Sequence, residues 1–330
     1  MKRAALTLVV GAVVAATTLI SLGAGASSSI STSPVARVWT EPQAGYGFLD
    51  AAIEGAHRSI DVSMYELSDT TMEHDLIAKA RQGLLVRVLL NSAYDGRYEN
   101  DASASLLSAG SVHVAWAPSG TIFHAKYVVI DDKAAYIGTG NFVSSDYAST
   151  RDFWLEDVKS SDVAAIVSTF AADFAHQDVA PRPSGGLVWS PGSTGALLSL
   201  IASAHTTLLV ENEEMDSAAV EQALSADARR GVVVKVVMTY SSEWSSALKG
   251  LERAGVHVST LGPSQLYIHA KVICADCTSS GGMVFIGSEN FSTSSLTYNR
   301  ELGVVTTSPI AVRAVEIAVN ADYATGTVTS

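Results

Sequence analysis

The sequence is poor in charged residues and has no stretch in which basic residues gather. Only 16% of the 330 residues are charged, and 21 basic against 33 acidic residues give a formal net charge of −12. Proteins that bind nucleic acid usually carry a basic stripe, because their affinity depends on neutralising phosphates. The excess of acidic over basic residues argues against a broad surface that binds nucleic acid, although a local cationic site can lie inside an acidic shell. The 48% hydrophobic content suffices for one large or two ordinary domains.

Cysteine is almost absent. The only two, Cys274 and Cys277, form a Cys-x-x-Cys. There is no second cysteine pair to complete a zinc site, and no thioredoxin-like βαβ pattern surrounds them, as a redox-active pair would require. We favour a local structural disulfide at a strand end, formed in an oxidising compartment. The spacing does not encode the geometry that such a bridge needs.

The N-terminus has the pattern of a targeting segment. Lys2 and Arg3 precede an uncharged stretch from Ala4 that closes with Ala24-Gly25-Ala26, a small-x-small pattern. We predict a signal peptide over residues 1–26 and a secreted chain. The alternative is an uncleaved N-terminal membrane anchor, because the apolar run approaches spanning length. A Ser/Thr-rich stretch follows, and we predict a disordered leader over 27–38.

The rest of the chain divides into two similar halves. The segment 80–88 reappears at 228–236, and 109–114 reappears at 254–258. A repeat of this length indicates a duplicated domain, because solenoid units are only about 20–50 residues long. A Pro/Gly cluster near residues 180–186 is typical of a domain boundary. We therefore predict domains over 39–180 and 188–330, joined by a linker at 181–187.

Each half shows the same alternation of strands and helices. Apolar, β-rich runs predict strands at 60–67, 86–91 and 112–115, and at 208–211, 232–239 and 256–260. Helical patterns lie between them at 72–81 and 102–109, and at 218–230 and 245–254. This alternation favours an α/β architecture with largely buried strands. The predicted fold is two similar α/β sandwich domains, each a mixed β-sheet flanked by helices.

The strongest signal is His-x-Lys-x4-Asp, which occurs at 124–131 and again at 269–276. Residues two apart in a strand share a face, so His124 lies beside Lys126, and His269 beside Lys271. An imidazole next to an ammonium suits a phosphate. The lysine neutralises oxygen charge, while the histidine attacks or transfers a proton.

Two further groups of residues follow each motif. Small-residue loops at 136–142 and 285–291 offer hydroxyl and amide donors, namely Thr139, Asn141, Ser288 and Asn290. Asp152 then follows His124, and Glu301 follows His269, in similar register. A carboxylate in register with each histidine would fix its tautomer and orientation. The motif aspartates, Asp131 and Asp276, fall on the opposite strand face, which favours a supporting role.

Together these residues resemble the phospholipase D superfamily, whose signature is two His-x-Lys-x4-Asp motifs, each followed by Gly-Ser-x-Asn. The resemblance covers about residues 40–325. It implies a pseudo-two-fold fold with both histidines facing one phosphodiester, and no metal or other cofactor. It also implies that His124 is the nucleophile and that His269 is the general acid/base. Lys126, Lys271, Asn141 and Asn290 would hold the phosphate, with Thr139 and Ser288 beside them.

The sequence departs from the family signature in the first half, where Thr139 replaces the usual Ser and Asp152 the usual Glu. The shorter Asp152 would either weaken His124 as a nucleophile or be compensated by a backbone shift. Glu211, Glu213 and Glu214 form an acidic cluster after a strand, and Tyr65 and Glu66 occupy the equivalent place in the first half. The cluster is either a solvated loop or a recognition element for a substrate cation such as a choline head group.

The expected activity is that of a secreted phospholipase D. It would hydrolyse a phospholipid at a membrane surface to phosphatidate and a free alcohol, through a phosphohistidine, as a monomer with an internal pseudo-dimer. Three alternatives stay open: a metal-independent endonuclease, a transphosphatidylase, and an inactive binding module that kept the fold.

Overall fold

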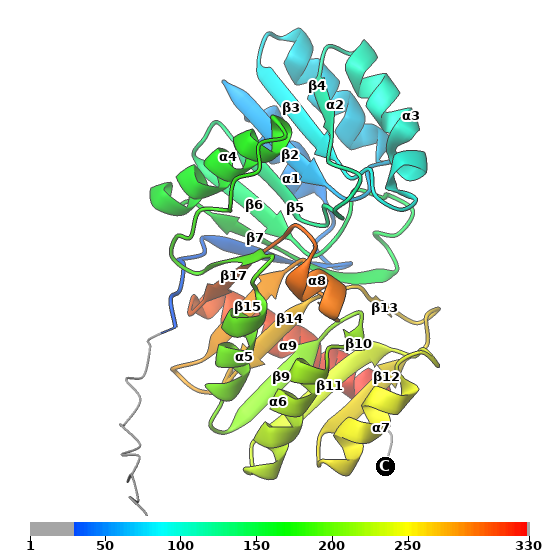
Figure 1. Ribbon diagram of the computed structural model, residues 1–330, viewed down its shortest axis with the longest axis vertical. Helices are drawn as coiled ribbons and strands as arrows, with labels where there is room; N and C mark the ends of the chain where they lie inside the picture. The colour runs from blue at the N-terminus through cyan, green and yellow to red at the C-terminus, as the bar shows by residue number, and fades with distance from the viewer. Residues whose placement is uncertain (1–29, 329–330) are drawn as a thin grey trace, which may run out of the picture.

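The computed structural model describes residues 30–328, and the predicted signal peptide lies outside this range. Both halves contain the predicted alternation (Figure 1). The first half runs β2 (Ser59–Met64), α2 (Thr70–Arg81), β3 (Leu85–Leu90), α3 (Gly96–Ala109) and β4 (His113–Trp116). The second half repeats it as β9 (Thr207–Glu211), α6 (Ala218–Arg229), β11 (Val233–Thr239), α7 (Ser245–Arg253) and β12 (His257–Leu261). The predicted fold class is confirmed.

The repeated segments of the sequence mark equivalent helix ends. Asp69 caps α2 by accepting hydrogen bonds from the backbone N–H groups of Thr71 and Met72, and Ser217 caps α6 in the same way. After each helix a glycine, Gly83 or Gly231, takes a positive φ and turns the chain into the next strand. The repeat thus encodes the same helix-to-strand connection twice.

Each half is built on an eight-stranded mixed sheet. The path of the first is β1-β7-β6-β5-β2-β3-β4, with β13 (Tyr267–Ile268) beside β7 as the eighth strand, and that of the second is β18-β12-β11-β9-β14-β15-β17-β8. In both, the β-α-β units pair in parallel and the strands that follow pair antiparallel. The other strands of these two paths are β1 (Arg37–Glu41), β5 (Lys126–Ile130), β6 (Ala134–Gly138), β7 (Thr150–Asp157), β8 (Leu187–Ser190), β14 (Val272–Ala275), β15 (Met283–Gly287), β17 (Glu301–Thr306) and β18 (Thr327–Val328).

A single hydrophobic cluster joins the two halves. Tyr127 and Phe153 of the first sheet belong to the same buried cluster as Val272 and Leu302 of the second. Helices α4 (Ser160–Phe174) and α9 (Pro309–Thr325) contribute to it as well. The outer cores lie under α1 (Gly47–Glu54), α2 and α3 in one half, and under α5 (Thr194–Ala202), α6 and α7 in the other. The two halves therefore share their central core.

The halves also exchange short strand pairings. Strand β13 (Tyr267–Ile268), which belongs to the second half, pairs in parallel with β7 of the first half. At the equivalent place, Phe123 of the first half forms a β-bridge with Arg300 of the second. Both exchanged segments lie immediately before a histidine of the repeated motif. Backbone hydrogen bonds therefore fix where each motif enters the interface.

The prediction of a disordered leader over 27–38 is wrong for the residues that the structure describes. Ser33 donates its backbone N–H to the Val305 carbonyl at 2.9 Å, and its hydroxyl bonds the Asp162 carboxylate. Val35 is buried in the central cluster, and β1 begins at Arg37. The Ser/Thr-rich composition concealed this packing, because one hydroxyl and one valine are enough to attach the segment. Leu187, assigned to the linker, begins β8.

Residues 30–328 include the two cysteines and all the helices that the structure describes. A disulfide joins Cys274, in β14, to Cys277 in the following turn, as the local disulfide prediction expects. No helix in this range is both long and apolar enough to cross a membrane.

Candidate active site

Both motif histidines lie at the interface between the halves. His124 precedes β5 and His269 follows β13. The backbone N–H of His124 donates to the Arg300 carbonyl at 2.8 Å, and that of His269 donates to the Arg151 carbonyl at 3.2 Å. Each motif is therefore anchored to the other half of the chain, at the arginine that immediately precedes Glu301 or Asp152.

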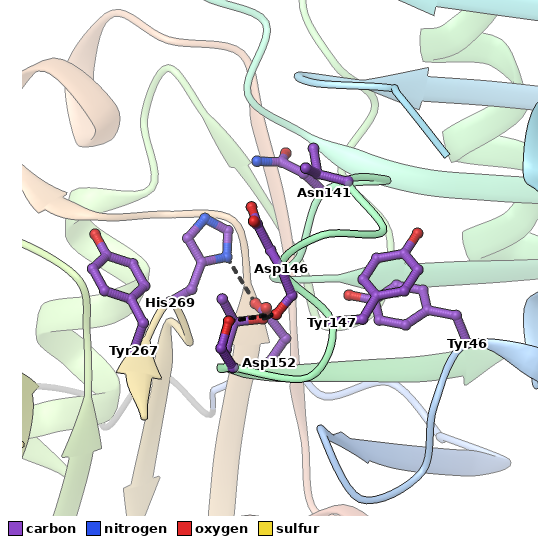
Figure 2. Close-up of a pocket in the computed structure, with 10 residues that line it drawn as sticks. Tyr46, Asn141, Asp146, Tyr147, Asp152, Tyr267 and His269 are labelled. Atoms are coloured by element: carbon purple, nitrogen blue, oxygen red, sulfur yellow. Dashed lines mark hydrogen bonds and ion pairs between the residues drawn. The ribbon is translucent and has the colours of Figure 1, made fainter. Parts of the chain in front are cut away.

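The carboxylates orient the histidines crosswise. His124 Nδ1 lies 2.9 Å from Glu301 Oε2. Figure 2 shows the other contact, in which His269 Nδ1 lies 2.8 Å from Asp152 Oδ1. The prediction that each acid orients the histidine of its own half is wrong. The reason is the strand exchange, which carries Arg300-Glu301 to His124 and Arg151-Asp152 to His269. The shorter Asp152 therefore serves His269 and leaves the predicted nucleophile, His124, with the longer Glu301.

Thr139 and Ser288 support these acids rather than a phosphate. The Thr139 hydroxyl donates to Asp152 Oδ1 at 2.5 Å, and the Ser288 hydroxyl donates to Glu301 Oε2 at 2.6 Å. Both side chains are fully buried. A hydroxyl has one proton to donate, and here the acid takes it. The structure thus differs from the prediction that Thr139 and Ser288 bind phosphate.

Glu301 has two further donors that the sequence reasoning missed. The Ser295 hydroxyl donates to Glu301 Oε1 at 2.7 Å, and the Asn299 amide donates to the same oxygen at 3.0 Å. Burial alone would raise the pKa of Glu301, but His124 holds it below its ordinary value. The acid is therefore ionised and fixed on both oxygens. Asn299 lies two residues before Glu301, which is the only signal that could have pointed to it.

His124 is prepared to act as a base or nucleophile. Burial, only partly offset by Glu301, lowers its pKa to about 4, so the imidazole is neutral near neutral pH. With Nδ1–H bound to the acid, Nε2 carries the free lone pair. The Tyr65 ring packs edge-on against the imidazole, with 4.8 Å between ring centroids.

The two lysines are fully buried and arranged alike. Each Nζ donates at 2.5 Å to the backbone carbonyl of its own motif histidine, Lys126 to His124 and Lys271 to His269. Burial, reinforced by the neighbouring Lys271, lowers the pKa of Lys126 to about 7. Two desolvated ammonium groups at one interface form a strong anion-binding site.

The two loop asparagines also lie at the interface. Asn141 lines a cavity of about 230 Å³ beside His269 and Tyr267 (Figure 2). The Asn290 amide donates to Glu214 Oε1 at 3.0 Å and faces Glu213 Oε2 at 3.4 Å. Within the described part of the chain, the amide oxygens of Asn141 and Asn290 have no hydrogen-bond partner. Two members of the acidic cluster, Glu213 and Glu214, thus lie within the site, and the solvated-loop interpretation is wrong for Glu213.

Comparison with known proteins identifies this arrangement. The family model "Cardiolipin synthase, PLD-like domain" matches residues 49–177 and 197–322, well over half of the chain. The chain belongs to this phospholipase D-like family. No curated protein matches the chain significantly in sequence.

Two solved structures share the fold. Phosphatidylserine synthase of Haemophilus influenzae is 11% identical, with a TM-score of 0.68 over 91% of this chain and 89% of the other. Polyphosphate kinase of Porphyromonas gingivalis is 16% identical, with a TM-score of 0.67 over 86% of this chain. The present chain spans only half the length of that kinase. At these identities the likeness establishes the phospholipase D-like fold and no more.

The motif aspartates of this phospholipase D-like chain do not face the histidines. Asp131 accepts hydrogen bonds from the backbone N–H groups of residues 57–59, and Asp276 accepts them from residues 205–207. Both aspartates have a positive φ, which Asp tolerates better than most residues. Each one ties the turn after the motif strand to the start of the neighbouring strand. The structure agrees with the predicted supporting role.

We expect Asp276→Ala to lower the free energy of unfolding by about 2–4 kcal/mol, because three backbone donors lose a charged acceptor. Urea unfolding measures the change, and Asp276→Asn, which keeps one acceptor oxygen, should lose less. Burial alone would raise the pKa of Asp276, but the backbone bonds from Thr207 and Thr206 lower it from 3.8 to about 2. Its contribution is therefore complete above pH 3.8 and disappears as the pH falls through about 2. Equal stability of the Ala variant and wild type would contradict this role.

Proposed function

We propose that the chain is a phospholipase D that hydrolyses a phospholipid to phosphatidate and a free alcohol. The observation that carries the proposal is the crossed pair of histidines. Each has its Nδ1 held by a buried carboxylate from the other half, which leaves its Nε2 as the reacting nitrogen. Two buried lysines lie beside them. This arrangement supplies a nucleophile, a proton donor and charge neutralisation for one phosphodiester.

In the first step His124 Nε2 attacks phosphorus. A P–N bond forms, the P–O bond to the head-group alcohol breaks, and protonated His269 gives its proton to the leaving oxygen. Glu301 stabilises the positive charge that develops on His124. Lys126 and Lys271 stabilise the charge on the phosphoryl oxygens. A negatively charged phosphate also favours the protonated form of Lys126, whose pKa is otherwise about 7.

In the second step the neutral His269 takes a proton from water. The water oxygen bonds to phosphorus, the P–N bond breaks, and phosphatidate leaves with His124 restored. Asp152 holds His269 Nδ1 through both steps at 2.8 Å. Burial alone would raise the pKa of Asp152, but His269 keeps it below its ordinary value, so the acid stays ionised.

Three observations support a lipid rather than a nucleic acid as the substrate. The chain carries a net charge of −12, which repels a polyanion. Glu213 and Glu214 add negative charge inside the site itself. The matching family is described by cardiolipin synthase, and one structural neighbour is a phosphatidylserine synthase.

We expect the purified full chain to release choline and phosphatidate from phosphatidylcholine vesicles in EDTA, because the proposed steps use only side chains. Mass spectrometry of the lipids and an enzymatic choline assay measure the two products. Lys271→Met, which removes one buried charge of the anion site, should reduce the rate by about 10²-fold or more.

Two parallel assays separate the alternatives. Plasmid degradation in EDTA that weakens steeply with salt, without phosphatidate from any phospholipid, would replace the proposal with a nuclease. Addition of an acceptor alcohol distinguishes hydrolysis from transphosphatidylation, since transfer yields the phosphatidyl ester of that alcohol.

We also propose that the chain acts outside the cytoplasm. The positively charged N-terminus, the apolar run and Ala24-Gly25-Ala26 support export, and a disulfide at Cys274–Cys277 is compatible with an oxidising compartment. Recovery of the protein from the culture medium with an N-terminus at Ser27 would support this proposal. Recovery only in the cytoplasm with residues 1–26 attached would contradict it.

A further inference from the structure

A carboxylate occupies the phosphate-binding part of the second motif. Glu213 Oε2 lies 2.9 Å from Lys271 Nζ, 3.4 Å from the Asn290 amide nitrogen and 3.6 Å from His269 Nε2. Its other oxygen accepts a hydrogen bond from the Tyr267 hydroxyl at 2.8 Å. Lys271 and Asn290 are assigned above to the substrate phosphate, and His269 is assigned to the oxygen that leaves it. The carboxylate therefore lies where a phosphoryl oxygen would bind.

Among the described residues of the first half, no carboxylate forms an ion pair with Lys126, and Glu66 acts on this lysine only at longer range. Leu67 forms a β-bridge with Phe142 in the same way that Met215 pairs with Phe291. Leu67 is therefore equivalent to Met215, and Tyr65, two residues earlier, is equivalent to Glu213. The Tyr65 ring contacts His124 and lies 5.0 Å from Lys126 Nζ. Lys126 thus faces an aromatic ring, while Lys271 faces a carboxylate. The pseudo-two-fold site is asymmetric at this pair of positions.

The asymmetry lies on the side of the leaving group. His269 gives its proton to the departing alcohol in the proposed function, so that alcohol must lie against His269 Nε2, which is 3.6 Å from Glu213 Oε2. The cavity beside His269 is lined by Tyr267, Tyr147 and Asp146 (Figure 2). Glu214, the residue after Glu213, accepts a hydrogen bond from the Asn290 amide. Carboxylates and tyrosine rings together favour a cation and repel an anion.

From this geometry we propose that Glu213 selects phosphodiesters whose leaving alcohol carries a positive charge, as in phospholipids with an amino-alcohol or quaternary ammonium head group. The inference rests on the proposed function. In the free site Lys271 and Glu213 form an ion pair. A zwitterionic head group replaces it with two: the phosphate takes Lys271, and the ammonium group takes Glu213. A head group without a cation displaces Glu213 from Lys271 and leaves the carboxylate unpaired in a partly buried site, which is unfavourable.

The first test compares kcat/KM for phosphatidylcholine and phosphatidylglycerol in matched vesicles. We expect the wild type to prefer phosphatidylcholine by about tenfold or more, the effect of one charge pair. Glu213→Gln should remove the preference, mainly through faster cleavage of phosphatidylglycerol, because no carboxylate then competes for Lys271. Glu213→Asp keeps the charge and should keep the direction of the preference. An equal loss on both lipids in Glu213→Gln, or an unchanged ratio, would overturn the inference.

A binding measurement separates this inference from the proposed function. Calorimetry with phosphocholine and glycerol 3-phosphate requires no turnover, and thermal unfolding shows that each variant is folded. We expect phosphocholine to bind the wild type about tenfold more tightly, and the two ligands to bind Glu213→Gln equally. Cleavage of both lipids at equal rates, with equal binding of both ligands, overturns the charge selection alone. Selective binding without cleavage of any lipid overturns the proposed function instead.

Discussion

His124→Ala should abolish the formation of the covalent intermediate and reduce kcat by about 10⁴-fold or more, because the variant lacks the group that attacks phosphorus. His269→Ala should behave differently with bis(p-nitrophenyl) phosphate, whose leaving group departs without a proton. Without its base, the phosphorylated enzyme accumulates, so this variant should release one equivalent of p-nitrophenol in a burst and then stop. Stopped-flow absorbance measures the burst, and an acid-quenched peptide map locates the phosphate.

The two variants are matched controls for each other, since each removes one imidazole from an equivalent position. Their comparison tests the asymmetry that the geometry indicates, with His124 neutral and His269 close to two carboxylates. A burst in His124→Ala, together with none in His269→Ala, would reverse the assigned roles.

Glu301→Gln should slow the burst itself by about 10²–10⁴-fold, because a triad-type acid fixes the tautomer of its histidine and stabilises the charge that develops there. Asp152→Asn should instead leave the burst largely intact and slow turnover by a comparable factor. This outcome follows from the crossed contacts of Glu301 with His124 and of Asp152 with His269. Pre-steady-state and steady-state rates with the same activated diester measure both effects.

Double variants provide the control for these assignments. Glu301→Gln should add little to the loss already caused by His124→Ala, since residues that act as a unit are strongly non-additive. Asp152→Asn should likewise add little to His269→Ala. A slower burst in Asp152→Asn with a normal burst in Glu301→Gln would show that each acid serves the histidine of its own half.

The sequence predicted the residues of the site better than it predicted their partners. The repeated motifs identify His124, Lys126, His269 and Lys271, because strand alternation places each pair on one face. The α/β repeat was equally readable, since apolar runs and helix-ending glycines recur at equivalent places. Spacing alone, however, assigns each acid to the nearest motif in its own half. The exchange of β13 and Phe123 between the halves reverses this assignment, and such tertiary pairings leave no local periodicity in a sequence.

Two other differences arise from tertiary contacts within one half. Thr139 and Ser288 have the right chemistry for phosphate, but their protons go to the buried acids that follow them 13 residues later. Glu213 is one of three acidic residues near a strand end, a pattern that usually indicates a solvated loop. Only the fold shows that this carboxylate forms an ion pair with Lys271.

The exchanged strands carry a consequence for the history of the chain. After a duplication, one copy is ordinarily free to accumulate changes while the other preserves the activity. Here the acid of each copy serves the histidine of the other, and the backbone of each copy anchors the other's motif. A damaging change in either half therefore disables both. The two copies therefore function as one unit, and they differ at positions such as Tyr65 and Glu213, where a difference between the halves gives the substrate a direction.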